Sequence, residues 1–412
     1  MNDSSATSNR TITFILCFLG AMAEGYDLQA GGVVLAKLVA AFQLTPEQRT
    51  WIPTANTIGL LIGALIGGWM ADRIGRKKVL QTSMLIFGVF MVATTYAWDA
   101  QSLIAMRFLV GLGLGGAMPN IISLLAESGG AGQQNAKGMI SRVTGLAAAI
   151  PFGGFLCVVL ALTIGGGFDW KTIVMVGGVV PIVIGLLMIP LLGESQVYLN
   201  HKSSQSARGQ TAPVGAGEAL FGGGRGLSTL LIWVAGICTL IVLYLLLGWL
   251  PVLMTGRGLT PVQATWVASM FALGGAIGAV GLGYLMRLGH KLVVTVTYGL
   301  MAVGVYMLAT VGNQFNIAMI ATLIVGIFVI GGQYLLYGLS PTYYPTAVRG
   351  TGVGAAVSIG RVGAVLGPWL AGNLLAGGST SAEVIMAILP AVAVAFVAAF
   401  WLVTRPHSAD GK

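Results

Sequence analysis

Charged residues are scarce in this sequence: only 8% of its 412 residues are Asp, Glu, Lys or Arg, against about a quarter in a soluble globular protein. Cysteine is also rare, and Cys17, Cys157 and Cys238 lie in apolar segments without CxxC spacing, which predicts neither disulfides nor a metal site. No Lys/Arg-rich tail is present, so the net charge of +9 does not indicate nucleic-acid binding. These absences exclude an ordinary soluble domain.

Long apolar runs fill most of the chain, and they do not alternate with a period of two residues, which argues against an outer-membrane barrel. Each run is close to the roughly 20 residues that a membrane-spanning helix needs. Segment 193–226 is polar and reads as a linker, with a short surface helix near residues 218–221. We predict an all-α membrane protein with a half at 1–192, a cytoplasmic loop at 193–226 and a half at 227–412. The twelve predicted spans are 11–42, 50–71, 79–98, 102–126, 137–164, 170–192, 227–253, 262–286, 291–311, 315–340, 349–376 and 381–404.

The basic residues predict the orientation of these spans. An even number of spans places both termini on one side of the membrane, and most Lys and Arg residues fall on that side, which the positive-inside rule makes cytoplasmic. The basic residues predicted outside are Lys37, Arg49, Lys171 and Arg257, and those predicted within spans are Arg107, Arg142 and Arg361.

Two acids, Glu24 and Asp27, interrupt the first apolar span. Their spacing of three residues puts both on one face of a helix. Acids inside a membrane span are costly and usually mark an ion or proton pathway. Burial and a neighbouring acid both favour the neutral form of a carboxylate, so such a group can gain and lose a proton near neutral pH.

The N-terminus has one alternative interpretation, a signal peptide cleaved after Ala21-Met22-Ala23. Cleavage there would remove the acid pair. The region before the apolar run carries only Arg10 as a cation, so a first membrane span is favoured.

The chain contains an internal repeat. The segment Gly67–Lys77 follows the second predicted span, and Gly281–Lys291 follows the eighth, with Arg, Gly and Lys at matching offsets. Two six-helix halves related by a parallel repeat are typical of secondary transporters with a central binding site. The stripe of Gly59, Gly63 and Gly67 has the small-xxx-small spacing of a helix-packing face.

Residues 68–77 resemble the signature loop of the major facilitator superfamily, G-x-x-x-D-R-x-G-R-[KR], at its place between the second and third spans. Within that superfamily, Glu24-Gly25-Tyr26-Asp27 is similar to the acid-Gly-aromatic-Asp motif of the aromatic acid:proton symporter family, although many members have Asp in place of Glu24. Segments 107–113, 331–333, 349–354 and 360–361 match that family as well.

The resemblance implies roles for particular residues. It assigns proton coupling to Glu24, Asp27, Arg107 and Glu127, although Arg107 could instead anchor its helix at the interface and Glu127 could simply be solvated. It assigns gating to the charge network of the signature loop and to one arginine at the start of the eleventh span. The gating residues are Asp72, Arg73, Arg76, Lys77 and Arg349.

Substrate binding is predicted for residues on the spans that line the cavity in this fold, together with two arginines. Arg361 lies 12 residues beyond Arg349, roughly 18 Å deeper in the membrane, and needs a counter-charge. That charge could be a substrate carboxylate, or Glu24 or Asp27 in a permanent ion pair. The remaining candidates are Tyr26, Asn120, Gln333, Tyr337 and Arg142, the last of which could instead snorkel to the headgroups. We assign Trp249, Tyr343 and Tyr344 to interfacial belts.

The sequence therefore predicts a monomeric inner-membrane symporter that brings an aromatic carboxylate inward with protons, uses no cofactor and is not an enzyme. One alternative is a drug/proton antiporter, which residues 149–154 favour weakly because the leading glycine of the antiporter motif is absent. Another is a transporter of a non-aromatic organic anion. A membrane-embedded enzyme or a receptor has no support from a metal-ligand set, a nucleophile triad or a large soluble domain.

Overall fold

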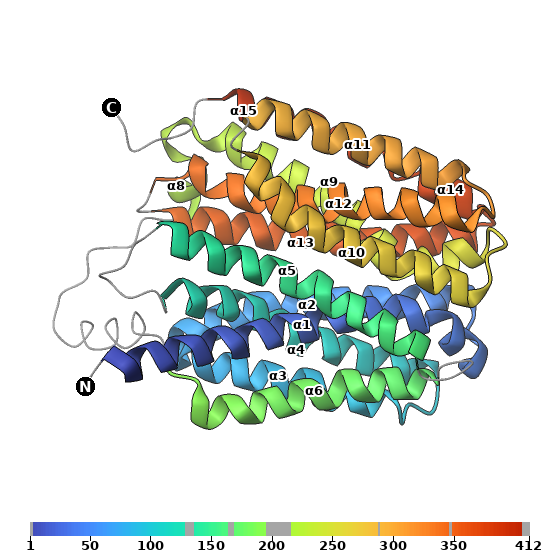
Figure 1. Ribbon diagram of the computed structural model, residues 1–412, viewed down its shortest axis with the longest axis horizontal. Helices are drawn as coiled ribbons and strands as arrows, with labels where there is room; N and C mark the ends of the chain where they lie inside the picture. Colours follow the sequence, from blue (N-terminus) through green and yellow to red (C-terminus); the bar gives the residue numbers. More distant parts are fainter. Residues whose placement is uncertain are drawn as a thin grey trace. The chain divides into compact units, whose positions relative to one another are not determined.

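The computed structural model describes residues 3–127, 136–163, 169–194, 216–286, 289–345 and 348–405, and within these ranges the regular structure is helical (Figure 1). The helices before the central linker are α1 (Asp3–Phe42), α2 (Pro46–Ile74), α3 (Arg76–Thr94), α4 (Ala100–Glu127), α5 (Ala136–Thr163) and α6 (Trp170–Leu191). After it come α8 (Ala216–Phe221), α9 (Gly226–Thr255), α10 (Pro261–Leu285), α11 (His290–Thr310), α12 (Phe315–Leu339), α13 (Arg349–Ala376), α14 (Ser381–Met386) and α15 (Leu389–Thr404), with short 3₁₀ turns at Gly222–Gly224 and Ser340–Tyr343.

Eleven segments within the described ranges are long and apolar enough to cross a membrane, with α14 and α15 together forming one of them. The fifth predicted span corresponds to α5, whose apolar part Ala148–Thr163 is shorter. The prediction of an all-helical, multi-pass membrane protein is confirmed. The last predicted span is not continuous, because Pro390 has no N–H to donate to Met386, and the helix breaks at residues 387–388.

The chain divides into two compact units. The first comprises Met1–Leu44 and Trp51–Thr211, and the second comprises Thr45–Thr50 and Ala212–Lys412. In the first unit α1 packs on α5 and α6, and α3 packs on α4 and α6. In the second unit α9 packs on α13 and α15, and α12 packs on α10 and α11.

Two polar residues, Asp99 and Ser102, cap the N-terminus of helix α4. The Ser102 backbone N–H donates to Asp99 Oδ1 at 2.7 Å, and Ser102 Oγ accepts from the Asp99 backbone N–H at 3.1 Å. This reciprocal arrangement satisfies N–H groups that have no partner inside the helix. The Ser102 backbone and hydroxyl hydrogen bonds hold the pKa of Asp99 below its usual value.

Glycine allows the helices of the first unit to approach closely. A Cβ on Gly59 would lie 2.1 Å from the Phe108 carbonyl oxygen of α4, and a Cβ on Gly63 would lie 2.1 Å from that of Leu112. On the other side of the unit, a Cβ on Gly25 of α1 would lie 1.8 Å from the Ile150 carbonyl oxygen of α5. The predicted packing role of the glycine stripe is therefore confirmed.

The second unit repeats these contacts. A Cβ on Gly274 of α10 would contact the Leu323 carbonyl oxygen of α12, just as a Cβ on Gly59 would contact that of Phe108. Each residue of the second pair lies 215 positions before its counterpart in the first. Gly278 likewise meets Ile327 as Gly63 meets Leu112. The helix interfaces repeat at a shift of 215, one position more than the shift of 214 between the two signature turns, and the shift of 215 lets positions on these helices be matched between the units.

The aromatic residues assigned to interfacial belts are buried, so that assignment is wrong. Trp249, Tyr343 and Tyr344 are each 1% exposed. The Tyr343 hydroxyl donates to the Leu402 carbonyl at 2.9 Å, and the Tyr344 hydroxyl shares a hydrogen bond with Thr229 at 3.0 Å. Each hydroxyl has a partner inside the unit, which removes the need for water at a membrane surface.

Arg257, one of the few basic residues predicted outside, has a structural role. Its guanidinium donates to the carbonyl groups of Ala309 and Gly312 at the C-terminal end of α11. A cation at this end satisfies unpaired carbonyls and interacts favourably with the helix dipole. This contact gives a structural reason for a basic residue on the side that is predicted to carry few of them.

Candidate functional site

Asp27 of α1 and Arg107 of α4 form a buried ion pair. Arg107 Nη1 lies 3.0 Å from Asp27 Oδ1, and the two residues are 2% and 0% exposed. A buried arginine and carboxylate compensate each other's desolvation, and loss of either partner leaves an uncompensated charge. The pair brings together two residues that are 80 positions apart and that the sequence resemblance assigns to proton coupling.

The neighbours of the pair are polar or polarisable. The side-chain amide of Asn56 on α2 donates through Nδ2 to Asp27 Oδ2 at 3.4 Å, so both carboxylate oxygens accept a hydrogen bond. Met91 Sδ on α3 accepts from Arg107 Nη1 at 3.3 Å. Four helices of the first unit therefore contribute to one buried site.

Two glycines make this convergence possible. A Cβ on Gly31, one turn after Asp27, would lie 2.9 Å from Arg107 Nη2. A Cβ on Gly111, one turn after Arg107, would lie 1.9 Å from the Asn56 carbonyl oxygen. The first glycine leaves room for the guanidinium, and the second lets α4 approach α2.

Two other residues of the acid motif, Glu24 and Tyr26, also lie inside the first unit. Glu24 lies one turn before Asp27 and is 3% exposed. The Tyr26 hydroxyl donates to the Ile173 carbonyl of α6 at 2.9 Å, and its ring lies against Gly177. Tyr26 therefore packs between α1 and α6, a position that gives no support to its predicted contact with substrate.

Arg361 and the predicted substrate residues of α12 belong to the second unit. Arg361 is 8% exposed and Gln333 is 5% exposed, and the Gln333 side-chain oxygen is buried without a hydrogen-bond partner in the described structure. Tyr337 is partly exposed, and its ring meets that of Tyr334 edge-on at 6.1 Å. In the first unit, Asn120 donates to the Gly116 carbonyl of its own helix at 2.8 Å. Within the first unit, the counter-charge found for Asp27 is Arg107, and the pairing of Arg361 with Glu24 or Asp27 considered from the sequence stays a prediction.

Four predicted site residues have side chains outside the described structure. Asp72, Glu127, Arg142 and Arg349 lie on α2, α4, α5 and α13, and their predicted roles in gating, proton coupling and substrate binding stay predictions.

The signature turn between α2 and α3 is held by the end of α6. Glu194 Oε1 accepts from the Lys77 backbone N–H at 3.0 Å, and Lys77 Nζ donates to the Ile189 carbonyl at 2.9 Å. A carboxylate at a helix N-terminus is favoured by the helix dipole. Arg73 stacks on Trp69 at 3.8 Å from its ring centroid, and Arg76 is partly exposed. Their gating role stays a prediction.

Gly75 in this turn has a counterpart that permits a controlled experiment. Gly75 and Gly289 precede α3 and α11 with φ values of 101° and 114°, a region that other residues enter at a cost of about 1–3 kcal/mol. A Cβ on Gly75 would also lie 2.2 Å from Glu194 Oε2, whereas a Cβ on Gly289 would meet nothing within 4 Å.

We therefore expect Gly75→Ala to lower the melting temperature in detergent more than Gly289→Ala does. Backbone strain is common to both variants, and displacement of Glu194 is specific to the first. Adding Glu194→Ala should reduce the difference between them. Equal losses for the two alanine variants would show that the Glu194 contact contributes nothing measurable.

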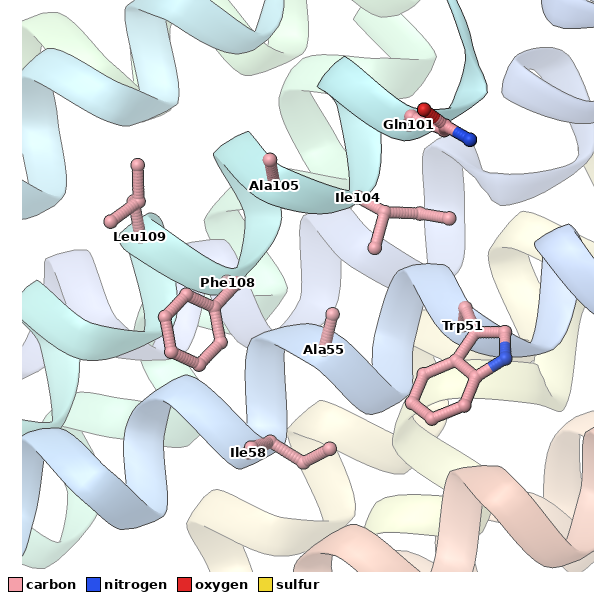
Figure 2. Close-up of a pocket in the computed structure, with 8 residues that line it drawn as sticks. All are labelled: Trp51, Ala55, Ile58, Gln101, Ile104, Ala105, Phe108 and Leu109. Carbon is pink, nitrogen blue, oxygen red and sulfur yellow. The ribbon is translucent and has the colours of Figure 1, made fainter.

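A groove on the first unit lies apart from these residues. It measures about 490 Å³ and lies along α2 and α4, and Figure 2 shows its lining. The lining residues are Trp51, Ala55, Ile58, Gln101, Ile104, Ala105, Phe108 and Leu109. Gln101 is the one hydrogen-bonding side chain besides the Trp51 indole, so the groove offers no charge to recognise an anion. Within the described ranges, no cluster of three His, Cys, Asp or Glu side chains could hold a metal ion.

Sequence reasoning missed Asn56, Gly31 and Glu194. A signal for Asn56 was available, because it lies one turn before Gly59 in one glycine stripe, and Arg107 lies one turn before Gly111 in another. Two such glycine stripes predict that α2 and α4 pack closely at the glycines. That contact would bring Asn56 and Arg107, which lie one turn before the stripes, close together. No comparable pattern marks Glu194, which lies in an irregular segment after α6.

Comparison with known proteins gives the same fold. The sequence profile of the Major Facilitator Superfamily matches residues 17–368 and 232–412. A 3-(3-hydroxy-phenyl)propionate transporter of Escherichia coli strain K12 is 40% identical, over 98% of this chain and 96% of its own. A 4-hydroxybenzoate transporter of Pseudomonas putida is 32% identical, over 93% and 90%. The crystal structure of a D-xylose-proton symporter covers 95% of this chain and 97% of its own, with a TM-score of 0.74 at 16% identity.

Proposed function

This chain belongs to the Major Facilitator Superfamily, and we propose that it is a secondary active transporter that takes up an aromatic carboxylate together with protons by alternating access. The substrate is of the hydroxyphenylpropionate or hydroxybenzoate type, because the relatives that match nearly the whole chain are transporters of such acids. The single observation that carries the proton coupling is the buried ion pair of Asp27 and Arg107.

The pair supplies a physical link between proton and anion. When Asp27 is ionised, it neutralises Arg107 across 3.0 Å in a medium that excludes water. When Asp27 takes up a proton, Arg107 keeps a positive charge that has lost its partner, and a buried unpaired charge is costly. A substrate carboxylate entering the same low-dielectric region lowers that cost, so protonation of Asp27 favours anion binding and anion binding favours protonation.

The proposed carboxylate ligand of the second unit is Arg361, whose guanidinium can bind a carboxylate through two parallel hydrogen bonds. Gln333 supports a second polar contact, because its buried side-chain oxygen can accept a hydrogen bond from a ring hydroxyl. Tyr337 offers an aromatic face to a benzene ring. Glu24, buried one turn from Asp27, is the second proposed proton carrier.

The remaining features of the proposal concern the setting of the protein. We place it in a bacterial inner membrane with both termini in the cytoplasm, as the distribution of basic residues supports. A proton gradient is the proposed energy source, with no cofactor, and the proposed functional unit is a monomer.

The decisive test is uptake by proteoliposomes that contain the purified protein. A panel of radiolabelled acids should include 3-hydroxyphenylpropionate, 4-hydroxybenzoate, an aliphatic dicarboxylate and a sugar acid, each with and without an inward proton gradient. We expect gradient-dependent accumulation of an aromatic acid that a protonophore abolishes. Accumulation of only an aliphatic acid would make the protein a transporter of another organic anion, and gradient-driven export of a hydrophobic cation would make it a drug/proton antiporter.

Arg361→Lys should selectively weaken the binding of carboxylates. A lysine keeps the charge but cannot reproduce the paired hydrogen bonds of a guanidinium. We expect affinity for the acid to fall at least tenfold, whereas the weaker affinity for the matching amide should change little. Titration calorimetry of wild type and variant with both ligands measures this. Equal losses for acid and amide would show that Arg361 stabilises the helix bundle and does not recognise the carboxylate.

A further inference from the structure

We propose that Asn56 is a positioning residue for the proton site: its side-chain amide hydrogen-bonds Asp27 in both protonation states and so sets the pH at which the Asp27–Arg107 pair opens. This inference rests on the proposed proton coupling and extends it to a residue on a third helix. Asn56 is 5% exposed and lies on α2, whereas Asp27 and Arg107 lie on α1 and α4.

The amide has the chemistry that this role requires. Asn56 Nδ2 now donates to Asp27 Oδ2 at 3.4 Å, which suits the ionised carboxylate. Asn56 Oδ1 is buried and has no hydrogen-bond partner in the described structure. An amide carries both donors and an acceptor, so rotation about its last bond would present Oδ1 to a protonated Asp27. A protonated Asp27 would thus donate its hydrogen bond to this unused acceptor. An asparagine with only a structural role would not need such an acceptor.

The backbone of Asn56 is fixed while its side chain remains near Asp27. A Cβ on Gly111 of α4 would lie 1.9 Å from the Asn56 carbonyl oxygen, so this turn of α2 is pressed directly against α4. Arg107 lies one turn before Gly111 on the same helix. The close contact therefore holds the Asn56 amide and the Arg107 guanidinium on opposite oxygens of one carboxylate.

The second unit provides an internal control. Gly326 of α12 meets Phe271 of α10 as Gly111 meets Asn56, a shift of 215 positions for both partners. The same shift applies to α1 and α9. Gly153 lies against Met22 of α1, Gly363 lies against Ile237 of α9, and Met22 and Ile237 are 215 positions apart.

With that shift, the counterparts of Asp27, Asn56 and Arg107 are Val242, Phe271 and Thr322. The glycine contacts that hold the helices together are kept, and all three members of the polar site are replaced. Asn56 is therefore not required for the packing of α2 on α4, and it occurs in the unit that has the ion pair.

Asn56 is an uncharged hydrogen-bond partner of Asp27, whereas other groups around Asp27 are ionisable. The ionisable groups near Asp27 in the described structure are Arg107 from α4, Cys157 from α5 and Tyr26 from α1 itself, and Glu24 lies buried one turn before Asp27 on α1. Helix α2 contributes the uncharged amide. A change at Asn56 therefore alters the hydrogen bonding of Asp27 without changing the charges around it.

The experiment compares Asn56→Leu with Thr57→Val in proteoliposomes. Leu has the same number and branching of side-chain heavy atoms as Asn but no hydrogen-bonding atoms. Thr57 is a matched control, because it is 4% exposed on the same helix and its hydroxyl bonds only carbonyls of α2, those of Pro53 and Thr54, in the described structure. Gradient-driven uptake is measured across pH, together with substrate exchange at equal pH on both sides.

We expect Asn56→Leu to move the pH of half-maximal uptake upward by about one unit, a tenfold change in the protonation equilibrium, because the hydrogen bond to the charged carboxylate is the stronger of the two that are lost. Exchange should continue, and Thr57→Val should follow the wild-type profile. An unchanged profile for Asn56→Leu overturns the role of Asn56, provided that wild-type uptake depends on the gradient. Wild-type uptake without a gradient would instead overturn the proposed function itself.

A second variant and a direct measurement guard against misfolding. Asn56→Ser is smaller and polar, and lacks the amide. Infrared spectra of the purified protein are recorded across pH. The band of the protonated Asp27 carboxyl is identified as the one that disappears in Asp27→Asn, and its intensity is followed against pH. The midpoint of that band should shift in both Asn56 variants and stay unchanged in Thr57→Val. A midpoint that matches wild type in a folded Asn56 variant overturns the inference.

Discussion

Replacing Asp27 by Asn is expected to abolish the accumulation of substrate against its gradient. The amide keeps the shape of the side chain and can still contact Arg107, but it cannot gain or lose a proton. With one proton per substrate, a gradient of one pH unit supplies about 1.4 kcal/mol and holds about a tenfold concentration ratio. In Asp27→Asn this ratio should fall to one, measured as the plateau of radiolabelled uptake in proteoliposomes.

A matched carboxylate-to-amide change separates this effect from general damage. Glu383 of α14 is exposed and caps that helix through Thr380, a role that Gln can also fill. Glu383→Gln should therefore accumulate substrate as wild type does. Full accumulation by Asp27→Asn, in protein that is inserted and binds substrate, would remove Asp27 from the coupling mechanism.

Replacing Arg107 by Gln is expected to impair both stability and transport. The change leaves the Asp27 carboxylate in a site that excludes water, with the Asn56 amide as its remaining side-chain partner in the described structure. Breaking a buried pair by removing one partner costs about 3–5 kcal/mol, which Asp27 can lower by taking up a proton. We expect a fall in melting temperature in detergent that is smaller at acidic pH, and uptake reduced at least a hundredfold.

The double variant distinguishes a paired charge from two independent residues. If Asp27 and Arg107 stabilise each other, Asp27→Asn with Arg107→Gln should recover most of the melting temperature lost in Arg107→Gln, since no charge remains buried. Transport should not recover, because the proposed proton carrier, Asp27, is absent. Additive losses of stability in the double variant would mean that the two side chains do not interact energetically.

The two units differ in what their matching positions carry. The first unit holds Asp27, Asn56 and Arg107 where the second has apolar side chains or threonine. The second unit places Arg361 at the position that matches Pro151 in the first, since Gly363 corresponds to Gly153. On the proposed function, the residues proposed for proton binding lie on one half of the repeat, and the arginine proposed for carboxylate binding lies on the other.

The sequence by itself determined the membrane-spanning architecture. Apolar runs of about 20 residues have few stable alternatives in a bilayer, because every backbone N–H and C=O must be paired within a helix. The helix bounds follow from the ends of those runs, which is why the predicted span 315–340 and α12 (Phe315–Leu339) nearly coincide. Glycine stripes at a spacing of four residues also identified packing faces, since small residues are what close helix contacts require.

Only the tertiary structure decided which side chains meet. Helical periodicity places Glu24 and Asp27 on one face of α1, but it does not say which helix that face meets. The partner of Asp27 is Arg107, 80 residues away, and their contact depends on room left by Gly31 and on the approach of α4 to α2 at Gly111. Arg107 and Arg361 are both arginines within apolar spans, so the sequence offered two counter-charges of equal chemistry. Ion pairing acts over a few ångströms, and the packing of α1, α2 and α4 brings Arg107 within reach of Asp27.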